Sequence, residues 1–158
     1  NSITKSDLVN AISKIFNLDV KEIGGLFDNE DRILTFQIEN IANALYFNQE
    51  VSFFIPYDIA RKESVLNSLI LGKKLFDIIN VPILIDDESD DPFQWLLIKD
   101  QKLYLIENME DIEQFELTFS EIKELSLQKA LFLLTNKLDN NKTAYLISDS
   151  KIWLTCIK

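Results

Sequence analysis

The stretch Ile33-Leu34-Thr35-Phe36-Gln37-Ile38-Glu39 alternates two sets of side chains. Leu34, Phe36 and Ile38 form one set, and the residues between them form the other. Successive side chains of a β-strand point to opposite faces of a sheet, so this period of two predicts a strand over residues 33–39. The fold class follows from the segments that precede and follow this strand.

Three segments have the spacing of an amphipathic helix. Residues 6–17 carry apolar side chains at steps of three and four, and residues 63–79 repeat that pattern. Residues 120–138 carry a leucine stripe at the same steps. Ser6 and Ser120 stand where helix N-caps are expected. We therefore predict helices over these three ranges.

Pairs of apolar runs around short polar turns predict β-hairpins. The predicted hairpins span residues 44–55, with a turn at 48–50, residues 93–106 and residues 143–157, and residues 83–85 form a single strand. A short helix over residues 41–47 is the alternative for part of the first hairpin. Strands in antiparallel runs between helices define the α+β class. We predict one domain over residues 1–158: a mostly antiparallel sheet, three main helices and an extra C-terminal hairpin.

The composition excludes most catalytic chemistry. The chain has no histidine, a single cysteine at position 156 and three glycines. Histidine-based triads and the common zinc sites therefore cannot form, and neither can an intramolecular disulfide. No glycine-rich phosphate-binding loop is present. We expect a non-enzymatic protein without cofactor or metal.

The acidic residues are concentrated in one quarter of the chain. Residues 86–124 hold 13 acidic and three basic side chains, which accounts for the whole net charge of −10. Such a field repels nucleic acid and anionic membranes and speeds encounter with basic proteins. A solvated loop that serves only solubility is the alternative interpretation. As partner-binding candidates we take the densest run: Asp86, Asp87, Glu88, Asp90 and Asp91.

Targeting signals are not recognised in the sequence. The first residues lack the apolar core of a signal peptide, and no apolar run approaches the roughly 20 residues of a membrane span. We expect a cytoplasmic protein that contacts neither membrane nor nucleic acid.

The order of these elements resembles the class I type III secretion chaperones, the Tir-chaperone-like family. The segments that carry the resemblance are residues 8–16, 33–57, 65–79, 93–106 and 122–138. The resemblance implies a homodimer that holds an extended segment of a secreted effector in apolar grooves on the first helix and the sheet. The predicted C-terminal hairpin departs from the family, because it lies beyond the usual last helix.

The same resemblance implies roles for particular apolar residues. The implied partner-binding residues are Leu8, Ile12, Phe16, Phe36 and Phe53. The implied dimer contact is made by Leu69 and Phe76 on the middle helix.

Two further functions fit the composition. A bacterial toxin-immunity protein would use the acidic run to attract and block a basic toxin domain. A mimic of nucleic acid would need acidic groups distributed like phosphates, which a single acidic quarter fits poorly.

Overall fold

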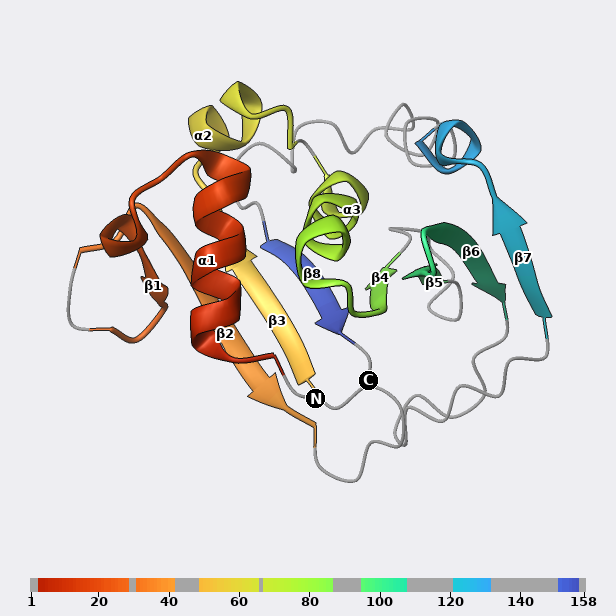
Figure 1. The fold of residues 1–158 in the computed structure, drawn as a ribbon, viewed down its shortest axis with the longest axis horizontal. Helices are drawn as coiled ribbons and strands as arrows, with labels where there is room; N and C mark the ends of the chain where they lie inside the picture. Colours follow the sequence, from red (N-terminus) through yellow and green to blue (C-terminus); the bar gives the residue numbers. More distant parts are fainter. Residues whose placement is uncertain are drawn as a thin grey trace.

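One eight-stranded sheet runs through the described part of the chain (Figure 1). The structure is a computed structural model. It describes residues 3–28, 31–41, 49–65, 67–86, 95–107, 121–131 and 151–156. In spatial order the strands are β1 (Ile23–Gly25), β2 (Leu34–Asn40), β3 (Gln49–Phe54), β8 (Lys151–Cys156), β4 (Ile83–Asp86), β5 (Trp95–Lys99), β6 (Lys102–Glu107) and β7 (Glu121–Leu125). Strands β1 and β2 are parallel, and all other neighbours are antiparallel.

Two long helices lie on one face of this sheet. Helix α1 (Lys5–Phe16) contacts β1 and lies in front of β2 and β3 in Figure 1, and α3 (Ser68–Ile79) contacts α1, β4, β5 and β8. The short elements are η1 (Val20–Glu22), α2 (Tyr57–Lys62) and a helical segment over residues 127–131. Helices combined with a mostly antiparallel sheet confirm the predicted α+β class. No helix in the described ranges is long and apolar enough to cross a membrane.

Helix α1 begins one residue before the predicted range, and its N-cap is Thr4 rather than Ser6. The Asp7 backbone N–H donates to Thr4 Oγ1 at 3.1 Å, and the Thr4 backbone N–H donates to Asp7 Oδ2 at 3.0 Å. These reciprocal bonds form a capping box in which Asp takes the place of the usual Glu or Gln. Bonds to Thr4 also hold the pKa of Asp7 below its usual value.

The predicted helix over residues 63–79 is interrupted near its start. Ser64 has a φ of 55°, which breaks the helical conformation between α2 and α3. Asn67 then caps α3 by accepting the Ile70 backbone N–H at 2.9 Å on its side-chain oxygen. The helix ends at Ile79 as predicted, and Asn80 follows it in the left-handed conformation that commonly closes a helix.

Residues 121–125 form strand β7 rather than the first turn of a helix. Pairing with β6 outweighs the helical preference of this stretch: Leu125 lies opposite Leu103, and Lys102 donates to Glu124 at 2.8 Å. The helical segment that follows is capped by Ser126, whose hydroxyl accepts the Lys129 backbone N–H at 3.2 Å. The capping serine was therefore predicted six positions too early.

The predicted turn at residues 48–50 is wrong at its last two positions, which belong to β3. Strand β3 pairs with β2, and residues 42–48 lie outside the described residues. Gln49 is buried because its side-chain amide bonds the backbone of Ile3: the Ile3 N–H donates to Gln49 Oε1 at 2.7 Å, and Gln49 Nε2 donates to the Ile3 carbonyl at 3.2 Å.

The predicted hairpin at 93–106 is confirmed for β5 and β6, and its turn places Asp100 and Gln101 at positive φ, as a two-residue type I′ turn requires.

The two halves of the sheet are buried differently. Strands β2 and β3 bury one face, with Leu34, Phe36, Val51 and Phe53 in the core toward the helices. Strands β4, β5 and β6 bury both faces. Toward the helices lie Ile83, Ile85, Leu96, Ile98 and Leu103, and on the opposite face lie Leu84, Leu97 and Ile106. This explains why core and outward-facing residues alternate along β2 and β3, whereas β4 and β5 contain continuous apolar runs.

Strand β8 lies in the middle of the sheet and not in an appended hairpin. It pairs with β3 over six residues and with β4 over two. The first part of the predicted hairpin, residues 143–150, lies outside the described residues. Without β8, both β3 and β4 would present an unpaired edge.

Removal of residues 151–158 should abolish cooperative unfolding, because the inner edges of β3 and β4 would lose their backbone partner. Thermal unfolding followed by circular dichroism measures this. A synthetic peptide of residues 151–158, added to the truncated protein, should restore the transition. A truncated protein that unfolds cooperatively at the temperature of the intact chain would contradict the central position of β8.

Gly72→Ala should destabilise the protein by roughly 1 kcal/mol, although alanine is the better helix former by about the same amount. A Cβ at this position would lie 2.5 Å from Ile85 Cδ1 and 3.3 Å from Ile98 Cδ1, and both isoleucines are buried. Ile85→Val removes the closer atom, so in that background Gly72→Ala should become neutral or stabilising. Chemical unfolding of the wild type, both single variants and the double variant measures this. A loss of the same size in both backgrounds would show that the contact does not limit the approach of α3 to β4.

Candidate functional site

The apolar residues that the chaperone resemblance assigned to partner binding lie in the core. They come from α1, β2 and β3 and face one another between the helices and the sheet. All are at most 2% exposed: Leu8, Ile12, Phe16, Phe36 and Phe53. The rings of Phe36 and Phe53 pack with centroids 6.2 Å apart. The resemblance implied that these five side chains line a partner-binding surface, and this is wrong because they lie in the core. The helix and strand faces that pack against one another there both belong to this chain.

The same correction applies to the implied dimer contact. Leu69 and Phe76 lie on the inner side of α3, and their exposed fractions are 0% and 2%. The sequence shows that α3 has an apolar stripe, but the partner of that stripe is this chain's own sheet.

The structure describes the acidic run only at its beginning. Asp86 is the last residue of β4, and the other four candidates, Asp87, Glu88, Asp90 and Asp91, lie outside the described residues. Trp95 of β5 is opposite Asp86 in register, so the chain leaves and re-enters the sheet at the same point. The contribution of the acidic run to partner binding stays a prediction.

A second acidic feature lies on the face of β2 and β3 that is turned away from the helices. Glu39 of β2 stands directly opposite Glu50 of β3 in register. Burial, and next to it the negative charge of Glu39, raise the pKa of Glu50 above its usual value. Among the described residues neither glutamate has an ion-pair partner, although the Gln37 side-chain amide donates to Glu39. Like charges placed directly opposite one another destabilise a sheet, so this pair lowers the stability of the free protein.

Sequence reasoning missed this pair of glutamates. The alternation of residues 33–39 places Glu39 on the polar face, but the partner strand and the register decide which side chain it meets. Residues 41–48 lie between the two strands, and the sequence predicted a hairpin over residues 44–55 instead of a pairing of β2 with β3. Only the register Ile38–Val51 brings Glu39 and Glu50 together.

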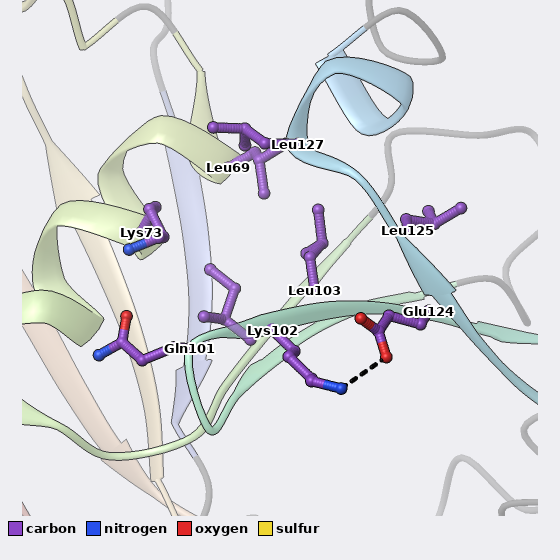
Figure 2. Close-up of a pocket in the computed structure, with 9 residues that line it drawn as sticks. Leu69, Lys73, Gln101, Lys102, Leu103, Glu124, Leu125 and Leu127 are labelled. Carbon is purple, nitrogen blue, oxygen red and sulfur yellow. Dashed lines mark hydrogen bonds and ion pairs between the residues drawn. The ribbon is translucent and has the colours of Figure 1, made fainter.

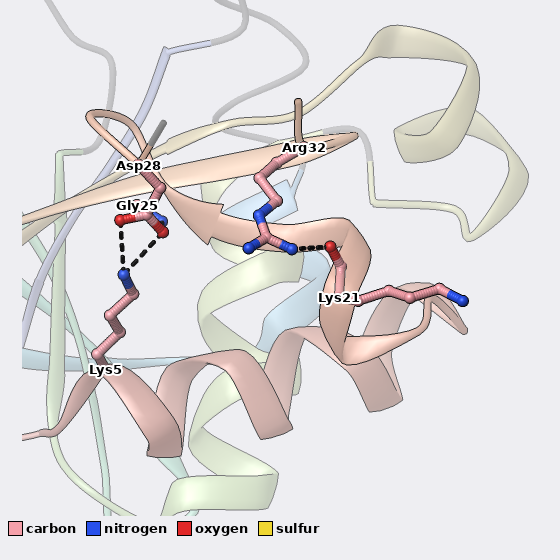
Figure 3. Close-up of polar contacts among 5 residues, drawn as sticks. All are labelled: Lys5, Lys21, Gly25, Asp28 and Arg32. Carbon is pink, nitrogen blue, oxygen red and sulfur yellow. Dashed lines mark hydrogen bonds and ion pairs between the residues drawn. The ribbon is translucent and has the colours of Figure 1, made fainter. Parts of the chain in front are cut away.

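The outer edge of β1 is closed by a side chain from its own turn (Figure 3). Asp28 Oδ2 accepts the Gly25 backbone N–H at 2.7 Å, and its two oxygens accept from Lys5 Nζ at 2.8 and 2.7 Å. These bonds, that from Lys5 first, hold the pKa of Asp28 below its usual value. The stability that they contribute is therefore present at neutral pH and is lost as the pH falls through the lowered pKa. A bonded edge does not offer a template for another strand.

The paired glycines of β1 leave room for the side chains that cover this strand. A Cβ on Gly24 would lie 2.8 Å from Asp28 Oδ2 and 3.0 Å from Arg32 Cγ. The Arg32 guanidinium in turn donates to the Lys21 carbonyl (Figure 3). Close approach, and not positive φ, explains the glycine at this position.

A cleft of about 160 Å³ opens between α3 and the β5–β7 end of the sheet (Figure 2). Its apolar wall combines Leu69 of α3 with Leu103 and Leu125 of the sheet, and Leu127 stands at its rim. The polar residues that line it are Lys73, Gln101, Lys102 and Glu124. The ion pair between Lys102 and Glu124 raises the pKa of Lys102 above its usual value.

The titratable groups of the described residues are distributed over several elements of the fold. They contain no group of three or more potential metal ligands. The titratable groups whose pKa shifts are resolved lie in a helix cap, a strand-edge clamp and cross-strand contacts of the sheet. Each of these shifts has a local structural cause.

Comparisons with protein families, with curated proteins and with solved structures found no match for this chain.

Glu50→Gln should raise the stability of the protein by a few tenths of a kcal/mol at pH 7, because it removes the repulsion from Glu39. The pKa of Glu50 is raised in the folded state, so the penalty is complete above that pKa and is lost as the pH falls through it toward the pKa of the unfolded chain. The gain should therefore shrink as the pH falls from 7 to 4.5, the ordinary pKa of a glutamate side chain, because Glu50 of the folded wild type becomes protonated over this range. Urea unfolding at both pH values measures this. A loss of stability at pH 7 would mean that Glu50 is held by a favourable contact.

Proposed function

We propose that this protein is a non-enzymatic module that binds a basic partner protein, as a toxin-immunity protein does. The observation that carries the proposal is the confinement of the whole net charge of −10 to residues 86–124. The remaining residues balance their charges. A protein that needed acidic groups only for solubility would gain as much from an even distribution.

The topology supports the proposal because the described strands that residues 86–124 supply are neighbours in the sheet. Residues 86–124 begin at the end of β4 and supply β5, β6 and nearly all of β7, which are consecutive in the sheet. The acidic residues of this region that the structure describes belong to these strands or to the turn between β5 and β6: Asp86, Asp100, Glu107, Glu121 and Glu124. A one-sided field of this kind orients an approaching basic protein before contact and raises the association rate.

The Glu39–Glu50 pair supports the same proposal from the other half of the sheet. The two carboxylates repel each other in the free protein, and a lysine or arginine of a partner placed between them would remove that repulsion. Functional surfaces commonly retain groups that lower the stability of the free protein. Neutralising the pair should then stabilise the free protein and weaken its affinity for the partner.

A secretion chaperone is the second candidate. The element order favours it, since α1, the strands β2 and β3, α3 and the hairpin β5–β6 follow one another as the resemblance implies. The residues expected to hold the cargo lie in the core, so a chaperone of this fold would need a different binding surface. We rank it below the basic-partner proposal for that reason.

The test compares two variants that each remove two negative charges. Asp90→Asn/Asp91→Asn acts within the acidic region, and Asp31→Asn/Asp58→Asn acts outside it on exposed residues. The partner is captured from the source organism and purified, and association rates are measured by stopped-flow at low salt. We expect the first variant to associate several-fold more slowly and the second to change little.

Equal rates for both variants would overturn the proposed role of the acidic region. Capture of a partner whose binding domain is acidic would overturn the proposal altogether. An extended segment of a secreted protein as the captured partner would instead support the second candidate.

A further inference from the structure

A second cleft lies between the two long helices, where α1 begins and α3 ends (Figure 1). Its volume is about 430 Å³. Protein clefts that bind small ligands commonly measure about 300–1,000 Å³. The residues that line it come from the first half of α1, from the last turn of α3 and from the segments next to these helices, and the structure describes all of them. The cleft is therefore large enough for a whole side chain of another molecule.

Most of the lining of this cleft is apolar. Ile3 and Ala11 are buried, and Ile79 and Val81 are half-buried. Ile78 adds an accessible apolar surface, since it is 39% exposed. Long polar side chains lay their aliphatic stems along apolar surface of this kind while the polar end bonds elsewhere.

The polar groups of the cleft favour a cation. Asp7 contributes a carboxylate, and Asn10 contributes an amide oxygen. Bonds from Thr4 occupy Asp7 Oδ2 and lower the pKa of Asp7, whereas no group of the described residues bonds Oδ1. Ile78 and Ile79 are the last two residues of α3, so the negative end of this helix dipole also lies at the cleft.

Basic groups of this chain do not occupy the cleft. None of the residues that line it is a lysine or an arginine. Lys5 and Lys73 each form an ion pair with a carboxylate that does not line the cleft. Lys14 lies seven residues beyond Asp7, about 10 Å further along α1. The last turn of α3 contains no basic residue, so no side chain of that turn neutralises the negative helix end.

We propose that this cleft receives one arginine side chain of the basic partner, with the guanidinium at Asp7 and Asn10 and the aliphatic stem against Ile78. Arginine fits better than lysine, because its five N–H donors form a planar fork that can reach acceptors on two helices at once. This inference rests on the proposed function, because that function supplies the partner. The contact itself lies on the helical layer and does not involve residues 86–124.

The first test titrates isotope-labelled protein with arginine blocked at both ends, as its N-acetyl methylamide, and follows the backbone amide signals by NMR. The signals of Asp7, Asn10 and Ile78 should shift. Blocked lysine should bind more weakly than blocked arginine, and blocked citrulline, which has nearly the same shape without the charge, should bind most weakly. Citrulline that binds as tightly as arginine would overturn the assignment of the cleft to a cation.

Two pairs of variants locate the site. Asp7→Asn should weaken the binding of blocked arginine about fivefold, because a neutral acceptor replaces a charged one while the Thr4 bonds can still form. Its matched control is Asp58→Asn, since Asp58 is also an exposed aspartate in the first turn of a helix and does not line the cleft.

Ile78→Ser should also weaken binding several-fold, because it removes the apolar contact of the stem. Its matched control is Ile33→Ser, since Ile33 is 44% exposed and lies outside the cleft. Both controls should leave the affinity unchanged, and thermal unfolding confirms that all four variants fold. Equal losses for a variant and its control would overturn the site.

The purified partner separates this inference from the proposed function. Asp7→Asn/Ile78→Ser should dissociate from it several-fold faster than the wild type does, because the contact forms only after docking. An unchanged dissociation rate would overturn the arginine contact and leave the basic-partner proposal intact. Capture of a partner whose binding domain is acidic would overturn both.

Discussion

The backbone pairing of β8 between β3 and β4 is the constraint on which the rest of the sheet depends. Strands β1 to β3 and strands β4 to β7 come from two successive parts of the chain, and β8 is the strand that joins them. Its pairing with β3 connects residues separated by about two thirds of the chain, so a large loop must close before these contacts form. Helix α3 supports the junction, because it contacts β4, β5 and β8 on one side and α1 on the other. Gly72 allows that support, since the helix backbone approaches Ile85 more closely than an alanine would permit.

This architecture separates stability from recognition. On β2, β3, β4, β5 and β6 the face toward α1 and α3 is apolar, and it includes Leu34, Phe36 and Phe53. Polar groups that lower stability, Glu39 and Glu50, lie on the other face of β2 and β3. One edge of the sheet is closed by the Asp28 clamp, and the acidic end carries β7 and the neighbouring cleft.

Local patterns in the sequence were sufficient to predict the elements that pair with near neighbours. The alternation around Phe36 predicted β2, and the polar turn at residues 100–101 predicted the hairpin of β5 and β6. Prediction failed where a contact distant in sequence decides the conformation. Strand β7 has the composition of a helix start and becomes a strand because β6 lies beside it. Gln49 has the composition of a turn and is buried because Ile3 bonds its side-chain amide. The central position of β8 has no local signature at all.

The candidate site was only partly predictable for the same reason. Charge is additive along a chain, so the acidic region was visible from composition. Exposure is not visible in this way, because an apolar stripe such as Leu8 and Ile12 looks the same whether its partner is this chain or another. The Glu39–Glu50 pair and the cleft beside Leu127 depend on strand register and on where α3 ends its cover of the sheet.

The most direct test of the central claim is the dependence of the association rate on salt, measured for the unmodified protein and its purified partner. The Debye length shrinks from roughly 30 Å at 0.01 M salt to about 8 Å at 0.15 M, so attraction by a region with a net charge of −10 weakens strongly over this range. The account predicts an association rate that falls at least tenfold between these concentrations, with a much smaller change in the dissociation rate. An association rate that stays constant across the range would contradict it, because the partner would then recognise a surface that the acidic end of the sheet does not influence.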